Sequence, residues 1–341
     1  MADRPLHAPS SAFLGLSFLA CACSGTPEAP VQEPARPPVR CALVIGVDGL
    51  RPDRFEQGFT PRMDALIAAG VAIEGSTNAW TPAEPWNGHS ATNWGVLLTG
   101  VSPAVSELTA NGDREHRVGR DNPAAPRVES IFGLVRAARP GVRTAVANTW
   151  PGILDADWTV LGRDRSVIDA TYNPKGSGSS ALRDVETTLF AAELLAHPQQ
   201  GADGDLMFVH LSQVDAAGHA HTYAGEEYDA AVAGADHLVG ELLDAIALRA
   251  TRGQEQWLVI LTSDHGGPPD GKGHGDNGDR HVREIPFVVR ADGVAFDVRP
   301  SSATLYDVAP TVQAWMTGDR GDLEGRAWAL TPSVIAPPPR R

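Results

Sequence analysis

Residues 257–267 read Trp-Leu-Val-Ile-Leu-Thr-Ser-Asp-His-Gly-Gly, an apolar run that ends in an adjacent carboxylate and imidazole. The apolar run predicts a buried strand, and the glycines let the backbone turn sharply after it. Carboxylate oxygen and imidazole nitrogen are both good donors to a divalent metal such as zinc. This segment therefore predicts that Asp264 and His265 are metal ligands at the carboxyl end of a strand.

Three other segments carry the same residue types in comparable places: 41–47 is followed by Asp48, 206–211 is followed by Asp215 and His219, and a glycine-rich loop holds His274. In an open parallel sheet the carboxyl ends of the strands share one edge, so these side chains should converge there. Three aspartates and three histidines suffice for two metal ions. A purely structural role does not need so many polar groups at buried strand ends.

Strands and helices alternate along the chain, which predicts an α/β fold with a doubly wound, mostly parallel central sheet and helices on both faces. The expected strands are apolar runs at 41–47, 71–75, 143–148, 206–211, 257–261 and 285–290. The expected helices show helical spacing or Pro and Gly at their ends, at 60–70, 128–138 and 226–250. Residues 163–180 show no period, so we expect a loop or a small insertion there.

The chain is acidic, with 341 residues and a formal net charge of -14 at pH 7. This charge argues against a protein that binds nucleic-acid polymers by neutralising phosphates. It would also repel an anionic substrate, so any phosphate chemistry must be driven locally, most simply by bound cations.

The chain resembles the alkaline phosphatase superfamily, in particular its type I phosphodiesterase and nucleotide pyrophosphatase branch. The motifs that carry the resemblance follow the family's order between residues 41 and 330: Val44–Asp53, Ser90–Gly100, Val214–His219, Ser263–Gly266, Gly273–Gly275 and Leu305–Thr311. The resemblance implies an alkaline phosphatase-like fold and a site for two divalent metal ions, usually zinc.

The resemblance also implies two ligand sets, one of Asp215, His219 and His274 and the other of Asp48, Asp264, His265 and Ser90. Ser90 would be the nucleophile, and the amide of Asn93 would contact a phosphoryl oxygen. A serine hydroxyl is a poor nucleophile near neutral pH, and coordination to a metal lowers its pKa so that it attacks as an alkoxide. Attack at phosphorus would give a phosphoserine, which water activated by the second metal would release. Thr92 is the competing nucleophile, and otherwise caps the following helix.

Other residues near these motifs have alternative assignments. His281 could replace His274 as a ligand, His89 and His221 are expected outside the ligand sets, and His210 is expected to be a strand histidine with satisfied hydrogen bonds. Lys272 either touches a substrate phosphate or is solvated. One of the tryptophans could stack on a flat leaving group, although core packing explains Trp94 equally well: Trp80, Trp86 and Trp94.

The ends of the chain are expected to lie outside the folded domain. A short apolar run at 12–20 precedes Cys21 and Cys23; it is too short to span a bilayer and resembles a bacterial secretion signal. We therefore divide the chain into a leader that resembles a signal or lipoprotein sequence (1–23), a Pro-rich linker (24–39), a catalytic domain (40–332) and a tail (333–341). This division predicts an exported protein, periplasmic, secreted or held in the cell envelope by a lipid on Cys21 or Cys23.

Together these features predict an exported two-metal phosphohydrolase that acts on a small phosphate ester. A phosphodiester or nucleotide-type substrate is favoured because Asn93 offers one neutral donor, whereas a dianionic monoester needs more positive charge. A phosphomonoesterase is the close alternative, since residues 111–127 include four arginines.

Three further functions fit the sequence less well. A sulfatase needs a Pro and an Arg in the motif around its modified Cys or Ser, and the segment after Ser90 lacks both. A phosphomutase would not normally be exported. A surface lipoprotein that only binds metal would need a broken ligand set, whereas every expected ligand is present.

Overall fold

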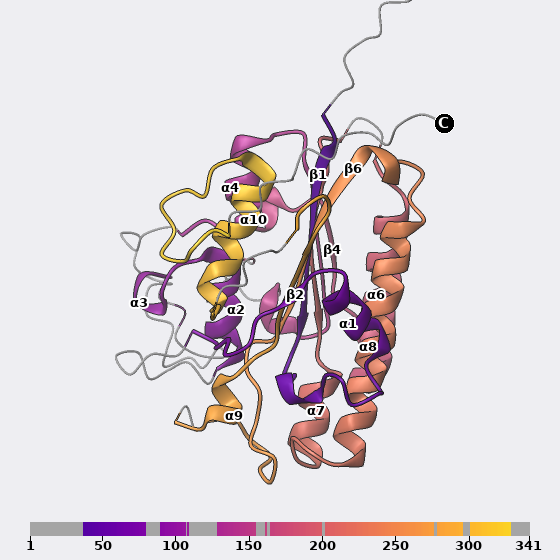
Figure 1. Cartoon of the computed structure of the whole chain (residues 1–341), viewed down its shortest axis with the longest axis vertical. Coiled ribbons are helices and arrows are strands. Elements are labelled where there is room, and N and C mark those ends of the chain that lie inside the picture. The colour runs from indigo at the N-terminus through magenta and orange to yellow at the C-terminus, as the bar shows by residue number, and fades with distance from the viewer. Residues whose placement is uncertain are drawn as a thin grey trace, which may run out of the picture. The chain divides into compact units, whose positions relative to one another are not determined.

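A seven-stranded, mostly parallel sheet forms the centre of the part of the chain that the structure describes (Figure 1). The structure is a computed structural model that describes residues 37–79, 89–106, 108, 128–154, 161, 164–199, 202–275, 278–295 and 301–328. The strand order is β2-β7-β6-β1-β5-β3-β4. The bounds are β1 Val39–Val47, β2 Val71–Ala72, β3 Arg143–Asn148, β4 Ala170–Tyr172, β5 Asp205–Leu211, β6 Glu255–Thr262 and β7 Phe287–Ala291.

The sheet confirms the predicted fold class. Strands β6, β1, β5, β3 and β4 pair in parallel, and only β7 makes antiparallel pairs with its neighbours, β6 and β2, within the described sheet. Figure 1 shows helices on both sides of this sheet. One side carries α2 (Ser90–Thr99), α3 (Pro103–Ser106), α4 (Ile131–Ala138) and α10 (Val308–Thr317), and the other carries α1 (Pro61–Ala68), α6 (Ser180–Ala196), α7 (Gln213–Ala220) and α8 (Glu226–Ala247).

Strand β1 is covered on both faces, which explains its uninterrupted apolar sequence. Ala42 and Val44 pack into the core formed with α2, α4 and α10. Cys41, Leu43 and Ile45 pack into the opposite core, formed with α1, α6 and α8. Because successive strand side chains point to opposite faces, a strand covered on both sides needs an apolar residue at every position.

The structure differs from the sequence prediction between residues 163 and 199. The segment expected to be a loop contains β4, and α6 begins directly after it. Strand β4 has three residues, all half-buried, at the edge of the sheet. A strand so short and so little buried shows no periodic pattern, which is why the sequence did not reveal it.

The predicted leader and tail, and all but the last residues of the predicted linker, lie outside the described residues, as do Cys21 and Cys23. From Pro38 onward the described residues group into one unit. Within them, no helix combines the length and the apolar character needed to cross a membrane.

Candidate metal centre

The predicted ligands lie where three neighbouring strands end: Asp48 after β1, Asp215 and His219 on α7 after β5, and Asp264 and His265 after β6. Gly49 allows β1 to end against α7. It adopts a left-handed conformation with a φ of 72°, and a Cβ there would lie only 2.8 Å from the Cα of Asp215. The glycine is therefore required both by the turn and by the close approach of α7.

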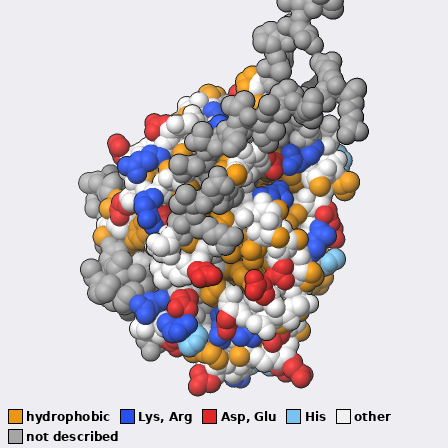
Figure 2. Space-filling model, viewed as in Figure 1, with side chains coloured by type: hydrophobic (Ala, Val, Ile, Leu, Met, Phe, Trp, Pro, Cys, Tyr) orange, Lys and Arg blue, Asp and Glu red, His pale blue; other side chains and the backbone are white. Residues whose placement is uncertain are grey.

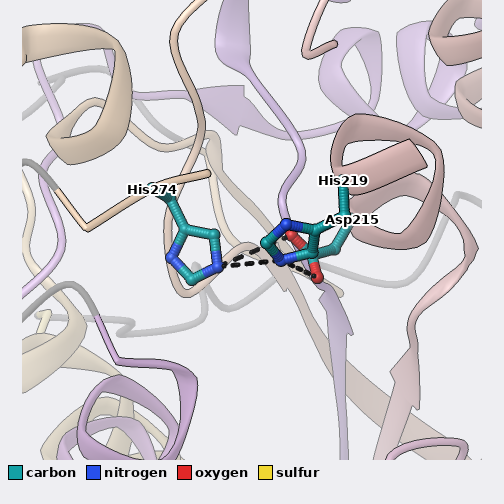
Figure 3. Close-up of side chains that lie close together, drawn as sticks. All are labelled: Asp215, His219 and His274. Atoms are coloured by element: carbon teal, nitrogen blue, oxygen red, sulfur yellow. Dashed lines mark hydrogen bonds and ion pairs between the residues drawn. The ribbon is translucent and has the colours of Figure 1, made fainter. Parts of the chain in front are cut away.

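The first ligand group consists of Asp215, His219 and His274, whose ligand atoms all lie within 4.8 Å of one another (Figure 3). Nε2 of His219 lies 3.4 Å from Oδ2 of Asp215 and 3.2 Å from Nε2 of His274. Nδ1 of His219 lies 2.7 Å from the carbonyl oxygen of Lys272. Because a carbonyl can only accept, Nδ1 carries the proton, and the Nε2 lone pair faces the group.

The second ligand group consists of Asp48, Asp215 and His265, which meet the same 4.8 Å limit. Asp215 therefore belongs to both groups. Nε2 of His265 lies 3.3 Å from Oδ1 of Asp48 and 3.4 Å from Oδ2 of Asp264, which places the remaining predicted ligand beside this group. Nδ1 of His265 lies 2.8 Å from the carbonyl oxygen of Gly266, so its Nε2 is the ring nitrogen that faces the group.

The electrostatics of the second group fit a divalent cation. Oδ1 of Asp48 and Oδ2 of Asp264 are buried and accept no hydrogen bond from the described residues. Burial raises the pKa of Asp264 well above its ordinary value, and the charge of Asp48 raises it further. Burial alone would lower the pKa of His265, but the charges of Asp264 and Asp48 raise it to about 10. Such a concentration of buried negative charge is stabilised by bound cations.

Ser90 is the first residue of α2, and its hydroxyl faces the second group. Its Oγ lies 3.3 Å from Nε2 of His265. The amino-terminal end of a helix carries partial positive charge, which favours an anionic group beside this hydroxyl. The competing nucleophile, Thr92, is fully buried. Thr92 does not cap α2 as predicted, because His89 occupies the N-cap position.

Asn93 lies one turn after Ser90 on α2, in the interior of the protein. Its side chain is fully buried, and its Oδ1 accepts a hydrogen bond from the backbone N–H of Ala79 at 3.4 Å. Residues three apart on a helix lie on the same face, so Ser90 and Asn93 share one face of α2. The hydrogen bond to Ala79 uses the amide oxygen, whereas a contact with a phosphoryl oxygen would use the amide NH2 group, so the contact of Asn93 with substrate stays a prediction.

Two buried residues that the sequence analysis did not assign to the site orient Asp48. Nε2 of His210 lies 3.1 Å from Oδ2 of Asp48, and Nε1 of Trp94 donates to the same oxygen at 3.5 Å. These contacts leave Oδ1 of Asp48 facing His265. The signal for His210 was present in the sequence, because it is a polar residue inside an otherwise apolar strand.

Asp184 of α6 is another buried residue that was not predicted near the site. It caps α7, the helix that carries the predicted ligands Asp215 and His219. Its Oδ2 accepts from the backbone N–H of Gln213 at 2.8 Å, and its Oδ1 accepts from that of Ser212 at 2.9 Å and from the hydroxyl of Thr149 at 2.6 Å. The N-cap residue of α7, Ser212, makes no side-chain cap of its own. Asp184 therefore sets the position of α7 from a neighbouring helix.

Replacement of Asp184 by Asn is expected to lower the free energy of unfolding by about 1 kcal/mol, the usual cost of losing a helix cap, and to weaken zinc binding several-fold. Urea unfolding and a chelator competition titration measure the two effects. Asp236→Asn is the matched control, because Asp236 caps α1 through the N–H groups of Arg62 and Met63. The control should lose similar stability and keep its zinc affinity. Equal zinc affinities of the two variants would contradict this role for Asp184.

The residues with alternative assignments lie outside both ligand groups. Lys272 is exposed, as its solvated alternative predicts, and its Nζ donates to the carbonyl oxygen of Ala220 at the end of α7 at 2.7 Å. Nδ1 of His281 lies 2.9 Å from Oδ1 of Asp279, the N-cap of α9 (Arg280–Arg283). Trp94 is 2% exposed and packs in the core. Three other candidates lie outside the described residues: Trp80, Trp86 and the loop 111–127.

Comparison with known proteins shows what the chain is similar to. The family model for type I phosphodiesterase / nucleotide pyrophosphatase matches residues 42–319. An uncharacterised pyrophosphatase/phosphodiesterase of Schizosaccharomyces pombe is 24% identical over 242 residues, which are 67% of this chain and 44% of that protein. The chain thus spans less than half the length of this curated relative.

Solved structures share the fold. Murine ectonucleotide pyrophosphatase / phosphodiesterase 5, an inactive variant in complex with AMP, aligns with a TM-score of 0.59 and 14% identity over 86% of this chain and 97% of the other. The C-terminal periplasmic domain of EcEptC from Escherichia coli, in complex with Zn, aligns with a TM-score of 0.58 and 18% identity over 83% of each chain. A putative sulfatase from Bacteroides thetaiotaomicron aligns with a TM-score of 0.63 and 12% identity over 86% and 74%.

Proposed function

Because the chain belongs to the type I phosphodiesterase / nucleotide pyrophosphatase family, we propose that it hydrolyses small phosphate esters through a phosphoserine on Ser90. Phosphodiesters and nucleotide-type esters are the favoured substrates. One observation carries the proposal: Oγ of Ser90 lies 3.3 Å from Nε2 of His265, at the start of a helix and beside two overlapping groups of metal-type ligands.

The two ligand sets that the family resemblance implies would hold two divalent cations. Asp215, His219 and His274 would bind one, and the other would be bound by Asp48, Asp264, His265 and Ser90. Imidazole nitrogens and carboxylate oxygens are the ligands that zinc prefers in catalytic sites, so zinc is the first choice. When bound, the cations would lower the pKa of the Ser90 hydroxyl and offset the charge of the transferred phosphoryl group.

The chain's own residues would then carry out an in-line displacement. Oγ of Ser90 loses its proton and attacks phosphorus while the bond from phosphorus to the leaving-group oxygen breaks on the opposite side, which joins the phosphoryl group to Ser90. A diester substrate would leave its second ester group on this phosphoserine, and a monoester would not. Water then attacks the phosphorus, the bond to Oγ breaks, and the hydroxyl is restored. His210 and Trp94 hold Asp48 in place throughout, since both contact its Oδ2.

The charges around the site support a diester substrate. The guanidinium of Arg51 is bound by both oxygens of Asp53, at 3.0 and 2.7 Å, and the ammonium of Lys272 is bound to a carbonyl. Among the described residues, these two cations near the ligand loops thus already have hydrogen-bond partners. A diester carries one charge on its phosphoryl oxygens and a monoester carries up to two, so the diester needs fewer additional cations.

A comparison of matched aryl esters tests this proposal. We expect the zinc-loaded protein to hydrolyse bis(p-nitrophenyl) phosphate with a kcat/KM at least about tenfold above that for p-nitrophenyl phosphate. A chelator should abolish both activities, and added zinc should restore them. A tenfold preference for the monoester would reassign the protein as a phosphomonoesterase. Failure of the zinc-loaded protein to turn over either ester would contradict the proposal as a whole.

We also propose that the domain from residue 40 to 332 acts outside the cytoplasm, after export directed by residues 1–23, with a lipid on Cys21 or Cys23 as the means of attachment. The neighbour from Escherichia coli is a periplasmic domain, which supports this location. The partner would be a small molecule. On the face drawn in Figure 2, Lys and Arg side chains are interspersed with Asp and Glu, which does not suit a nucleic-acid polymer. Cell fractionation combined with mass spectrometry of the N-terminus tests location and lipidation together.

A further inference from the structure

Tyr223 lies four residues after His219, on the segment that follows α7. Its side chain is fully buried, and its hydroxyl donates to Oδ1 of Asp215 at 2.5 Å. Its ring meets the imidazoles of His219 and His274 edge to face, at centroid distances of 6.0 and 6.3 Å. Tyr223 thus contacts all three members of the first ligand group.

Two glycines make room for this ring. A Cβ at Gly218, the residue before His219, would lie 2.4 Å from Cε1 of Tyr223. A Cβ at Gly267, two residues after His265, would lie 2.2 Å from its Cγ. Carbon atoms in proteins do not approach so closely, so both glycines are needed if the ring is to occupy this place.

Two hydrogen bonds fix the backbone of Tyr223, one at its carbonyl and one at its N–H. Its carbonyl accepts from Nη1 of Arg51 at 2.8 Å, which ties it to the segment after Asp48. Its N–H donates to the carbonyl oxygen of Gly271 at 3.3 Å, which ties it to the loop that carries His274. The tyrosine therefore has a defined position relative to two segments that are distant in the sequence.

We propose that Tyr223 is a positioning residue that acts through Asp215, an inference that rests on the proposed function. Asp215 is the carboxylate shared by the two ligand groups. The hydroxyl of Tyr223 holds Oδ1, so the carboxylate is rotated with Oδ2 towards Nε2 of His219, 3.4 Å away. Hydrogen bonds to a ligating carboxylate orient it and tune its affinity for the metal.

Tyr223→Phe tests the proposal, because it removes the hydroxyl and keeps the ring between the glycines. In the full-length protein we expect zinc affinity to fall by about 10- to 100-fold for one of two ions, measured by competition with a chromophoric chelator. The absorption spectrum of the cobalt-substituted protein should change. At saturating zinc, kcat should fall more than KM changes. Tyr172→Phe is the matched control, because Tyr172 stacks on Phe190 away from the ligands and should leave all three readouts unchanged.

The melting temperature of the chelated protein separates positioning from general stability. It should differ little between Tyr223→Phe and wild type, since the hydroxyl acts on the ligand Asp215. Zinc affinity within twofold of wild type together with an unchanged cobalt spectrum would overturn the inference. A wild-type protein that bound no zinc would instead refute the proposed function, so the two failures are distinguishable. Gly267→Ala provides a second route, because the added methyl group must displace the ring and should weaken zinc binding in the same way.

Discussion

Ser90→Ala is expected to lower kcat for the aryl diester by roughly 10³- to 10⁶-fold, the range seen when a nucleophile is removed from an enzyme that forms a covalent intermediate. The reason is the position of its Oγ, 3.3 Å from Nε2 of His265 and at the amino-terminal end of α2. Without this hydroxyl, only direct attack by water remains. Steady-state kinetics at saturating zinc measure the loss, and elemental analysis establishes whether the variant still binds its metal ions.

Thr92→Ala is the matched control for this experiment, since Thr92 lies on the same helix but is fully buried. It should keep wild-type kcat within about twofold, a difference of less than 1 kcal/mol in the activation barrier. Acid quenching during turnover of the diester, followed by peptide mass spectrometry, should find an aryl phosphate group on Ser90. Retention of more than a tenth of the activity by a metal-loaded Ser90→Ala protein would rule out the covalent mechanism on this residue. A large loss in Thr92→Ala alone would move the nucleophile to Thr92.

The sequence was informative where a ligand directly follows a strand. Asp48, Asp264 and His265 could be placed because the carboxyl ends of parallel strands meet at one edge, a property of the topology alone. The direction of a helical side chain depends on how the helix is rotated, which a local sequence pattern does not give. The metal-binding and catalytic roles of the predicted site residues stay predictions until they are measured.

Contacts between distant segments were not accessible from local patterns. Asp184 lies on α6, a helix that the sequence analysis did not identify, and it caps a helix 29 residues further along the chain. Tyr223 was also missed, although Gly218 and Gly267 left a signal for it. Both glycines stand beside predicted ligands, and nothing in the local sequence explains why a side chain is excluded there. A glycine next to a ligand thus points to a bulky neighbour from another segment.

Removal of the cations is expected to destabilise the protein, and the effect should grow as the pH rises. Burial raises the pKa of Asp264 and of Asp215 above 3.8, and the charge of Asp48 adds to both shifts. An acid with a raised pKa binds more protons in the folded state than in the unfolded state, so stability falls as the pH rises. His265 acts in the same direction, because its pKa is raised from 6.5 to about 10 and its contribution is lost over that range.

The lowered pKa of Asp48 does not offset this loss of stability at neutral pH. Burial alone would raise its pKa, but the hydrogen bond with His210 and the charge of His265 lower it, so its contribution is present above pH 3.8 and is lost only in acid. Metal binding strengthens with pH instead, because the ligands must be deprotonated. The gap in melting temperature between zinc-loaded and chelated protein should therefore widen by about 5 °C or more between pH 6 and pH 9, given that about 1 kcal/mol corresponds to 2–4 °C in a domain of this size class. Calorimetry with and without a chelator measures the gap.

Asp264→Asn separates this explanation from a general effect of pH. The substitution removes one buried charge, so the chelated variant should melt above chelated wild type at pH 8 while zinc binding and hydrolysis are lost. Asp236→Asn is the control, because burial also raises the pKa of Asp236, which lies on α8 and caps α1. Its gap should match that of wild type. Two outcomes would contradict this explanation. One is a gap in melting temperature that stays constant or narrows from pH 6 to pH 9. The other is a chelated Asp264→Asn protein less stable than chelated wild type, and either would show that the cations do not act by relieving repulsion among these carboxylates.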